Sequence, residues 1–339
     1  MPSFSLDPSL LMTEVYSYPF PEVRNLLASL RIDERFMLNT LPIVEAESMI
    51  AGLGFVPPLA LTSRTDRTLD LDELHVPVQA RIEAILAKRL TGLHTFAHRY
   101  PVHGSSPAIF ALLAEWKATG VLTSIAVLAG DYEGYRALAE SLQIPITSYP
   151  SFENAKPRRG EIWFTSNPSA RDGNWIPAEE WSAFVASGCA VVVDAAYVGL
   201  TADDVSIDVS AQNILAVLTS PSKIFGVFRY RLTGTTFVRA PITAMYANKW
   251  FKDIPALLQT LALYEQFADN WLPKSYRHWQ HDICFHLEGV VEAPIHASDT
   301  ILLASAQGPV APRFDSFQRG SVLRFGLTKT FEDYERQMS

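Results

Sequence analysis

Polar side chains able to do chemistry follow successive apolar runs in the middle of the chain, at the points where the runs end. The runs at 124–130, 161–166, 189–193 and 213–219 read as strands. Ligands of open parallel sheets bind beyond the carboxyl ends of the strands, so we expect these side chains to meet at one edge of one sheet. The residues are Ser105, Ser106, Asp131, Tyr132, Asn167, Asp194, Tyr197, Ser220, Ser222 and Lys223.

The stretch VLTSPSKIFGVFRYRLTG, residues 217–234, places a lone lysine, Lys223, where a buried strand ends. Taken alone, Lys223 would be interpreted as a solvent-exposed lysine in a loop. That interpretation weakens because the neighbouring strand ends supply other functional groups: a helix start that can bind an anion, an aromatic side chain and a carboxylate. An amine in such a setting can form a Schiff base with an aldehyde.

One cofactor matches this set of groups. The helix start at 105–106, together with Ser220 and Arg231, suits a phosphate dianion. Asp194 can pair with a protonated ring nitrogen, and Tyr132 can stack on a flat ring. Lys223 can then hold an aldehyde. We therefore predict pyridoxal 5'-phosphate as the cofactor.

Helices and strands alternate through the part of the chain that carries these residues. Helical spacing is seen at 104–119, 131–143 and 177–188, between the apolar runs. This order predicts an α/β fold with a mostly parallel central sheet flanked by helices. We expect a large domain at 76–269. A smaller α+β lobe would combine both chain ends, 1–75 and 270–339, with short strands and a final helix in its C-terminal part.

Bulk properties narrow the class of protein. The chain has 339 residues, 48% of them hydrophobic, which is enough for a large core. The net charge of −8 disfavours nucleic acid or an anionic membrane as the main partner. Two scattered cysteines, Cys189 and Cys284, give no disulfide framework. The start of the chain lacks the pattern of a signal peptide. We expect a cytoplasmic protein.

The chain resembles the pyridoxal-phosphate enzymes of fold type I, the aspartate aminotransferase superfamily, and in particular the class I/II aminotransferases. The resemblance covers about residues 90–335. It is carried, in the order and approximate spacing of the family, by the segments HGSSPAIFALLAEW, AGDYEGYRALAE, TSNPSARDGNWIP, VVVDAAYVGL, SPSKIFGVFRYRLTG and SVLRFGLTKTFEDYER. The combination D-x-x-Y, S-x-S-K and an arginine eight residues after the lysine is the specific part.

The resemblance assigns roles to individual residues. Lys223 would form the Schiff base and move the proton of the substrate Cα. Asp194 would keep the pyridine nitrogen protonated, Tyr197 and Asn167 would hydrogen-bond the phenolic oxygen, and Tyr132 would stack on the ring. The implied phosphate ligands are Ser105, Ser106, Ser220 and Arg231. Arg324 would hold the α-carboxylate of the substrate.

The resemblance also implies an activity and an assembly. We expect an enzyme acting on an α-amino acid, with aminotransfer to a 2-oxo acid first. A lyase, cyclase or oxidase of specialised amino-acid biosynthesis is the alternative, because one fold of this kind supports many reactions. We also expect a homodimer. The family's Tyr-Pro-x-x-Gly segment has no counterpart in the stretch TLDLDELHVPVQARIEAILAKRL.

Three other classes of protein remain open. His94 and His98 have helical i, i+4 spacing and His103 follows, which raises a zinc site, although no carboxylate completes a known motif. Ser105 stands at a strand-to-helix turn as in a serine hydrolase, although the G-x-S-x-G elbow is absent from this segment. A regulator that binds an amino acid without turnover is the third, and Lys223, Asp194 and Arg324 speak against it.

Overall fold

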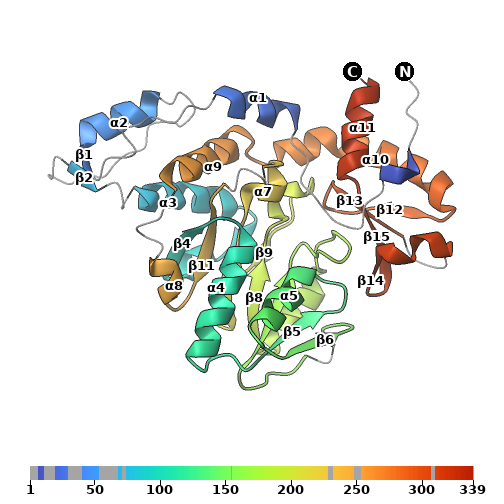
Figure 1. Cartoon of the computed structure of the whole chain (residues 1–339), viewed down its shortest axis with the longest axis horizontal. Helices are drawn as coiled ribbons and strands as arrows, with labels where there is room; N and C mark the ends of the chain where they lie inside the picture. Colours follow the sequence, from blue (N-terminus) through green and yellow to red (C-terminus); the bar gives the residue numbers. More distant parts are fainter. Residues whose placement is uncertain are drawn as a thin grey trace.

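A seven-stranded sheet forms the centre of the molecule (Figure 1). The computed structural model describes residues 7–10, 20–29, 40–52, 68–70, 74–153, 155–227, 232–247, 253–306 and 310–338. The sheet order is β4-β11-β10-β8-β7-β5-β6. Its strands are β4 (His98–Val102), β5 (Ser124–Leu128), β6 (Ile146–Tyr149), β7 (Glu161–Ser166), β8 (Ala190–Asp194), β10 (Ile214–Leu218) and β11 (Gly234–Val238).

The strand directions confirm the predicted fold class. Neighbouring strands from β10 to β6 run parallel, and β11 is antiparallel to both of its neighbours. The strands predicted from the four apolar runs are β5, β7, β8 and β10. The three predicted helices are α4 (Ser105–Ala118), α5 (Glu133–Ser141) and α6 (Ala178–Ala186). These predictions are confirmed.

Both faces of the sheet are buried, which explains its continuously apolar strands. Along β8, Val192 packs in a core shared with α4 and α5, whereas Val191 and Val193 pack in a second core. That second core includes α6 together with α3 (His75–Leu86) and α9 (Ile254–Gln266). Successive side chains of a strand point to opposite faces, so one apolar strand serves both cores.

A second, antiparallel sheet is built from the end of the chain, and we call it the C-terminal sheet. Its order is β12-β13-β15-β14. Its strands are β12 (Ile295–Ala297), β13 (Leu303–Ala306), β14 (Gln318–Arg319) and β15 (Val322–Gly326), and the helix α11 (Thr328–Met338) follows. Short strands and a final helix were predicted for this part of the chain, and both are present.

The long helix α10 (Trp271–Val291) is a correction to the sequence prediction, which gave this segment no helix. Its buried apolar residues, among them Tyr276, Ile283, Leu287 and Val291, lie on one face. Charged and histidine side chains fill the positions between, and Pro273 stands near the start. Proline is tolerated in the first turn of a helix, so Pro273 begins the helix instead of ending it.

The remaining elements are short. The first part of the chain contains η1 (Pro8–Leu10), α1 (Pro21–Ser29), β1 (Thr40–Pro42), α2 (Ile43–Gly52) and β2 (Thr68–Asp70), with β1 and β2 paired antiparallel. The others are β3 (Leu90–Thr91), η4 (Leu93–Thr95), η5 (Val198–Leu200), β9 (Ile207–Asp208), α7 (Pro221–Ile224), α8 (Thr243–Ala247) and η8 (Pro312–Phe317). The domain boundaries at 76 and 269 stay predictions.

The segment that carries His94 and His98 is not one helix. His94 lies in the short helix η4 and His98 in strand β4, so the expected helical i, i+4 spacing of these imidazoles is wrong. Within the described parts of the chain, no helix has the length and apolar character needed to cross a bilayer.

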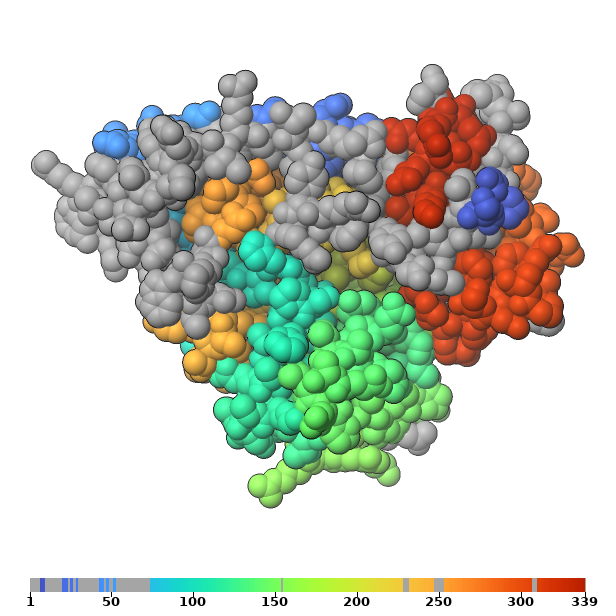
Figure 2. All heavy atoms as spheres, viewed as in Figure 1, coloured from blue at the N-terminus to red at the C-terminus, as the bar shows by residue number. Residues whose placement is uncertain are grey.

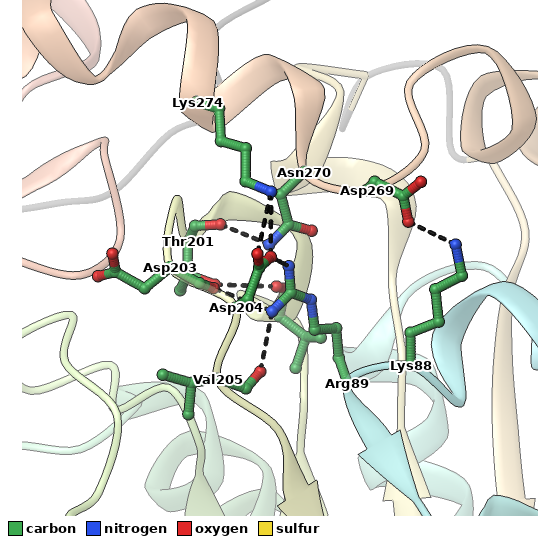
Figure 3. Close-up of polar contacts among 10 residues, drawn as sticks. Lys88, Arg89, Thr201, Asp203, Asp204, Val205, Asp269, Asn270 and Lys274 are labelled. Atoms are coloured by element: carbon green, nitrogen blue, oxygen red, sulfur yellow. Dashed lines mark hydrogen bonds and ion pairs between the residues drawn. The ribbon is translucent and has the colours of Figure 1, made fainter.

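Polar side chains join the start of α10 to the loop between η5 and β9 and to Arg89, which precedes β3 (Figure 3). Asp204 accepts hydrogen bonds from both Arg89 and Lys274, with a Lys274 Nζ to Oδ1 distance of 3.0 Å. Asn270 Nδ2 donates to Thr201 O at 2.7 Å. Asp269 and Asn270 have left-handed backbones, with φ of 56° and 57°, and therefore turn the chain between α9 and α10.

The two sheets also touch through glycine backbones. A Cβ on Gly130, which follows β5, would lie 2.5 Å from the carbonyl carbon of Arg319. A Cβ on Gly320, in the turn between β14 and β15, would lie 2.5 Å from Ala129 O. Both glycines have positive φ, 86° and 59°. The β14–β15 turn can approach the end of β5 this closely because neither residue has a side chain.

Gly130→Ala should therefore destabilise the protein by about 1–3 kcal/mol, because it adds a left-handed alanine and a backbone overlap. Gly289→Ala is the matched control. Gly289 lies inside α10 with nothing within 4 Å of a Cβ, so this change should be neutral or stabilising by about 0.5–1 kcal/mol. Urea denaturation of both variants checks the pair. Equal midpoints would show that the glycine contact does not constrain the fold.

Candidate active site

Lys223 lies on the one-turn helix α7, directly after β10. Ser220 caps this helix by accepting a hydrogen bond from Ser222 N at 3.2 Å, and Pro221 occupies the first turn. The turn directs Lys223 back toward the strand ends, where its Nζ lies 5.4 Å from the ring centroid of Tyr197. Burial is the main cause that lowers the pKa of Lys223 to about 8; the charge of Asp194 opposes this change and the charge of Arg324 adds to it.

Asp194 ends β8 and lies in register with Ser166 of β7 and Leu218 of β10. Its Oδ1 accepts a hydrogen bond from Ala196 N at 3.1 Å, and its Oδ2 faces the Tyr135 hydroxyl at 3.4 Å. Burial raises the pKa of Asp194 to about 7, and the charge of Lys223 acts in the opposite direction. The site therefore holds a buried acid that a cationic partner would keep ionised.

Asn167 follows β7 and is completely buried. Its Oδ1 accepts a hydrogen bond from Ile176 N at 3.1 Å, which leaves the amide Nδ2 as the group that can donate. Among the described residues this Nδ2 has no hydrogen-bond partner. A buried donor without a partner is costly, so Asn167 fits a bound group that carries an acceptor oxygen.

Two tyrosines come from neighbouring strand ends. Tyr197 is buried just after β8, where burial raises the pKa of its hydroxyl and the charge of Arg324 opposes the rise. Tyr132 precedes α5, and its hydroxyl lies 3.1 Å from Ser106 Oγ. The ring of Tyr132 meets that of Tyr135 edge to face, with 5.3 Å between centroids. Tyr132 thus lies between the start of α4 and the helix α5.

The first turn of α4 forms an anion-binding corner with the cap of α7. Gly104 has φ of 90°, and a Cβ there would lie 3.7 Å from Ser220 Oγ and 4.0 Å from Ser222 Oγ. Ser105 and Ser106 open the 14-residue helix beside these hydroxyls. The free N–H groups and the dipole of a helix N-terminus favour a phosphate, so this corner fits the phosphate of the expected cofactor.

Arg324 reaches the site from strand β15 of the C-terminal sheet. It is 7% exposed, and its Nη1 donates to Ala170 O. Burial lowers the pKa of its guanidinium, while Tyr197 is the strongest influence in the opposite direction. The loop at 168–175 that supplies Ala170 also receives the turn at 298–300, through Trp175 N to Asp299 Oδ2 at 2.8 Å and Thr300 N to Gly173 O at 2.9 Å.

The structure brings most of the sequence-predicted residues to one edge of the large sheet. Those placed there are Ser105, Ser106, Tyr132, Asn167, Asp194, Tyr197, Ser220, Lys223 and Arg324. Arg231 lies outside the described residues. Their roles stay predictions. Sequence reasoning missed Tyr135, which faces Asp194; the available signal was a second tyrosine three residues after Tyr132, in the first turn of α5.

Comparisons with known proteins agree with this fold. Residues 123–263 match the sequence model of the family aminotransferase class I and II. None of the curated proteins matches the chain. Substrate-bound BacF from Bacillus subtilis superposes with a TM-score of 0.63 at 14% identity, covering 97% of this chain and 88% of its own.

Two other solved structures represent different chemistries on the same fold. The L-threonine-O-3-phosphate decarboxylase of Porphyromonas gingivalis has a TM-score of 0.56 at 14% identity, covering 79% of this chain and 87% of its own. The pyridoxal-phosphate-bound C-S lyase of Staphylococcus hominis has a TM-score of 0.57 at 12% identity, covering 77% and 80%. The chain thus has the fold of pyridoxal-phosphate-dependent fold-type I, aminotransferase-like proteins, and the family match points to pyridoxal 5'-phosphate as the cofactor.

The pKa of Lys223 sets a pH dependence that can be measured on cofactor-free protein. Only the neutral amine attacks an aldehyde, so the rate of pyridoxal 5'-phosphate capture should rise with pH and level off above about pH 8. An ordinary lysine would keep rising toward its usual pKa of about 10.4. Stopped-flow absorbance on the wild type gives this profile. Lys329→Ala removes an exposed lysine on α11 and, as the control, should give the same profile. A plateau only above pH 10 would contradict the burial of Lys223.

Proposed function

We propose that the protein is a pyridoxal-phosphate-dependent enzyme acting on an α-amino acid, with aminotransfer to a 2-oxo acid as its reaction. The observation that carries this proposal is the buried amine of Lys223, whose pKa is lowered to about 8, held among Asp194, Tyr197 and Arg324. A lysine in water stays protonated and unreactive at neutral pH. Burial beside another cation makes it a nucleophile and a base.

The residues divide the work of binding and proton transfer. Lys223 Nζ would hold the aldehyde carbon of the cofactor and, as a free amine, would accept the proton of the substrate Cα. Asp194 would keep a proton on the ring nitrogen, and Asn167 Nδ2 and Tyr197 would hydrogen-bond the ring oxygen. Tyr132 would supply a face for the ring, while Ser105, Ser106, Ser220 and Arg231 would hold the phosphate. When bound, the cofactor supplies an electron sink for negative charge at the substrate Cα.

Arg324 supports Cα–H cleavage over decarboxylation. A guanidinium binds a carboxylate through two parallel hydrogen bonds, so it would hold the α-carboxylate in place during the reaction. A lyase, cyclase or oxidase acting on a specialised amino acid is the second candidate, favoured by the C-S lyase and decarboxylase among the structural neighbours. We further propose a cytoplasmic homodimer, because enzymes of this fold usually build the site at a two-fold interface.

The first test combines spectroscopy with chemical trapping. Purified protein supplied with pyridoxal 5'-phosphate should turn yellow, and borohydride should fix the cofactor to the peptide that contains Lys223, as seen by mass spectrometry. Lys223→Ala should lose both signals, and Lys329→Ala should keep both. A keto acid formed from an added amino acid supports aminotransfer, whereas ammonia or a cyclised product supports the second candidate. Wild type without a yellow band would refute the cofactor assignment.

Arg324→Lys separates substrate binding from cofactor binding. Lysine keeps the charge but loses the bidentate fork, so the amino-acid concentration needed for half-maximal bleaching of the yellow band should rise about tenfold to a hundredfold. Uptake of pyridoxal 5'-phosphate, measured by the same band before substrate is added, should be unchanged. Loss of cofactor uptake in Arg324→Lys would contradict the role proposed for this arginine.

A further inference from the structure

A hollow of about 240 Å³ lies beside the proposed site, where β5 and β6 end. One wall comes from α5 and β6, with Glu133, Arg136 and Ser148. The opposite element is the β14–β15 turn, with Gln318, Arg319 and Gly320, which is the turn held against Gly130 by the glycine contact. The surfaces of these two parts of the chain, green and orange-red, adjoin in Figure 2.

Two arginines from different parts of the fold border the hollow. Arg319 belongs to the C-terminal sheet, its side chain is 21% exposed, and its Nη2 lies 3.9 Å from the carboxylate of Glu133. Arg136 belongs to α5 and donates to Ser148 Oγ at 3.1 Å. Together with the hydroxyl of Ser148 and the side-chain amide of Gln318, these two guanidinium groups can donate hydrogen bonds to an anion.

The acidic residues of the hollow do not cancel this pair. Asp131 is turned toward β7, where it accepts hydrogen bonds from Ser166 Oγ, Ser166 N and Tyr132 N. Glu133 is 73% exposed and only loosely paired with Arg319, so its carboxylate can move into solvent at little cost.

The hollow adjoins both the proposed cofactor site and the strand pair that carries Arg324. Tyr132 is part of its lining, and the hydroxyl of the same tyrosine contacts Ser106 at the phosphate corner. Arg319 of β14 is paired with Val322 of β15, and Arg324 lies two residues further along β15. Successive side chains of a strand alternate between faces, so Arg319 and Arg324 are diagonal neighbours on one face of the C-terminal sheet, within reach of one small molecule. In agreement, the charge of Arg319 lowers the pKa of Arg324.

We infer that this hollow is the subsite for an anionic group on the side chain of the amino-acid substrate, with Arg319 as the residue that selects for it. The inference rests on the proposed function and deepens it. Arg324 would hold the α-carboxylate, and Arg319, assisted by Arg136, would hold a second carboxylate or a phosphate. The substrate class is thus an amino acid with an acidic or phosphorylated side chain. Binding would bridge α5 and the C-terminal sheet.

Calorimetry with inert acids tests the subsite without turnover. Succinate carries two carboxylates, and butyrate matches its length with only one. The purified full-length protein should bind succinate about tenfold more tightly than butyrate at low ionic strength. Arg319→Gln should remove the preference, and Glu133→Gln should strengthen it. Arg313→Gln, an exposed arginine of the same part of the chain that pairs with Glu292, should leave the preference unchanged.

A spectral titration then identifies the anion. With pyridoxal 5'-phosphate bound, L-glutamate and O-phospho-L-serine should each be compared with L-glutamine through the change in the yellow band. Preference for glutamate assigns a carboxylate and preference for phosphoserine assigns a phosphate. Thermal unfolding verifies that Arg319→Gln is folded. Arg319→Lys keeps the positive charge and should retain part of the preference.

Two results would overturn the inference, and they are distinguishable from failure of the proposed function. Equal affinity for succinate and butyrate removes the subsite, even if the cofactor binds as proposed. A succinate preference that survives in folded Arg319→Gln removes Arg319 as the selecting residue. A protein that takes up no pyridoxal 5'-phosphate but prefers succinate through Arg319 would refute the proposed function and keep the anion subsite.

Discussion

Burial of opposite charges at the carboxyl edge of the sheet is the constraint on which the rest of the site depends. Asp194 ends β8, and Lys223 lies on α7 just after the neighbouring parallel strand β10. The same apolar packing that stabilises those strands removes water from both groups. Burial therefore brings the pKa values of amine and acid close to neutrality, about 8 and about 7. The fold thus produces a reactive amine and a tunable acid as a consequence of its own core.

The surrounding residues fix the geometry of this pair. Asn167 is oriented by Ile176 N, Asp194 by Ala196 N and Tyr135, and Lys223 by the cap of α7. These positions belong to one sheet and its loops. Arg324 belongs to the other sheet, so its position depends on how the two sheets meet, through the loop at 168–175 and the contact of Gly130 with Gly320.

The side chains at the strand ends could be predicted from the sequence, because the polar residue that follows an apolar run marks the end of a buried strand of a parallel sheet. Lys223, Asp194 and Asn167 were found in this way. The sequence prediction missed α10, whose buried apolar residues are separated along the chain by charged and histidine residues and which has a proline, Pro273, near its start. Nor could it predict the pairing of Gly130 with Gly320 or the hollow beside Arg319, because those contacts join segments about 190 residues apart, which no local pattern encodes.

The contact between Arg324 and Ala170 spans 154 positions of the chain. The proposed cofactor ligands, Arg231 included, all precede residue 232, whereas Arg324 is made about 90 residues later. A chain is synthesised from its N-terminus, and its earlier parts begin to fold first. On the ribosome, the groups that would hold the cofactor are therefore available well before the group that would hold the substrate. The last strand to emerge would then convert a surface that binds the proposed cofactor into one that can select an amino acid.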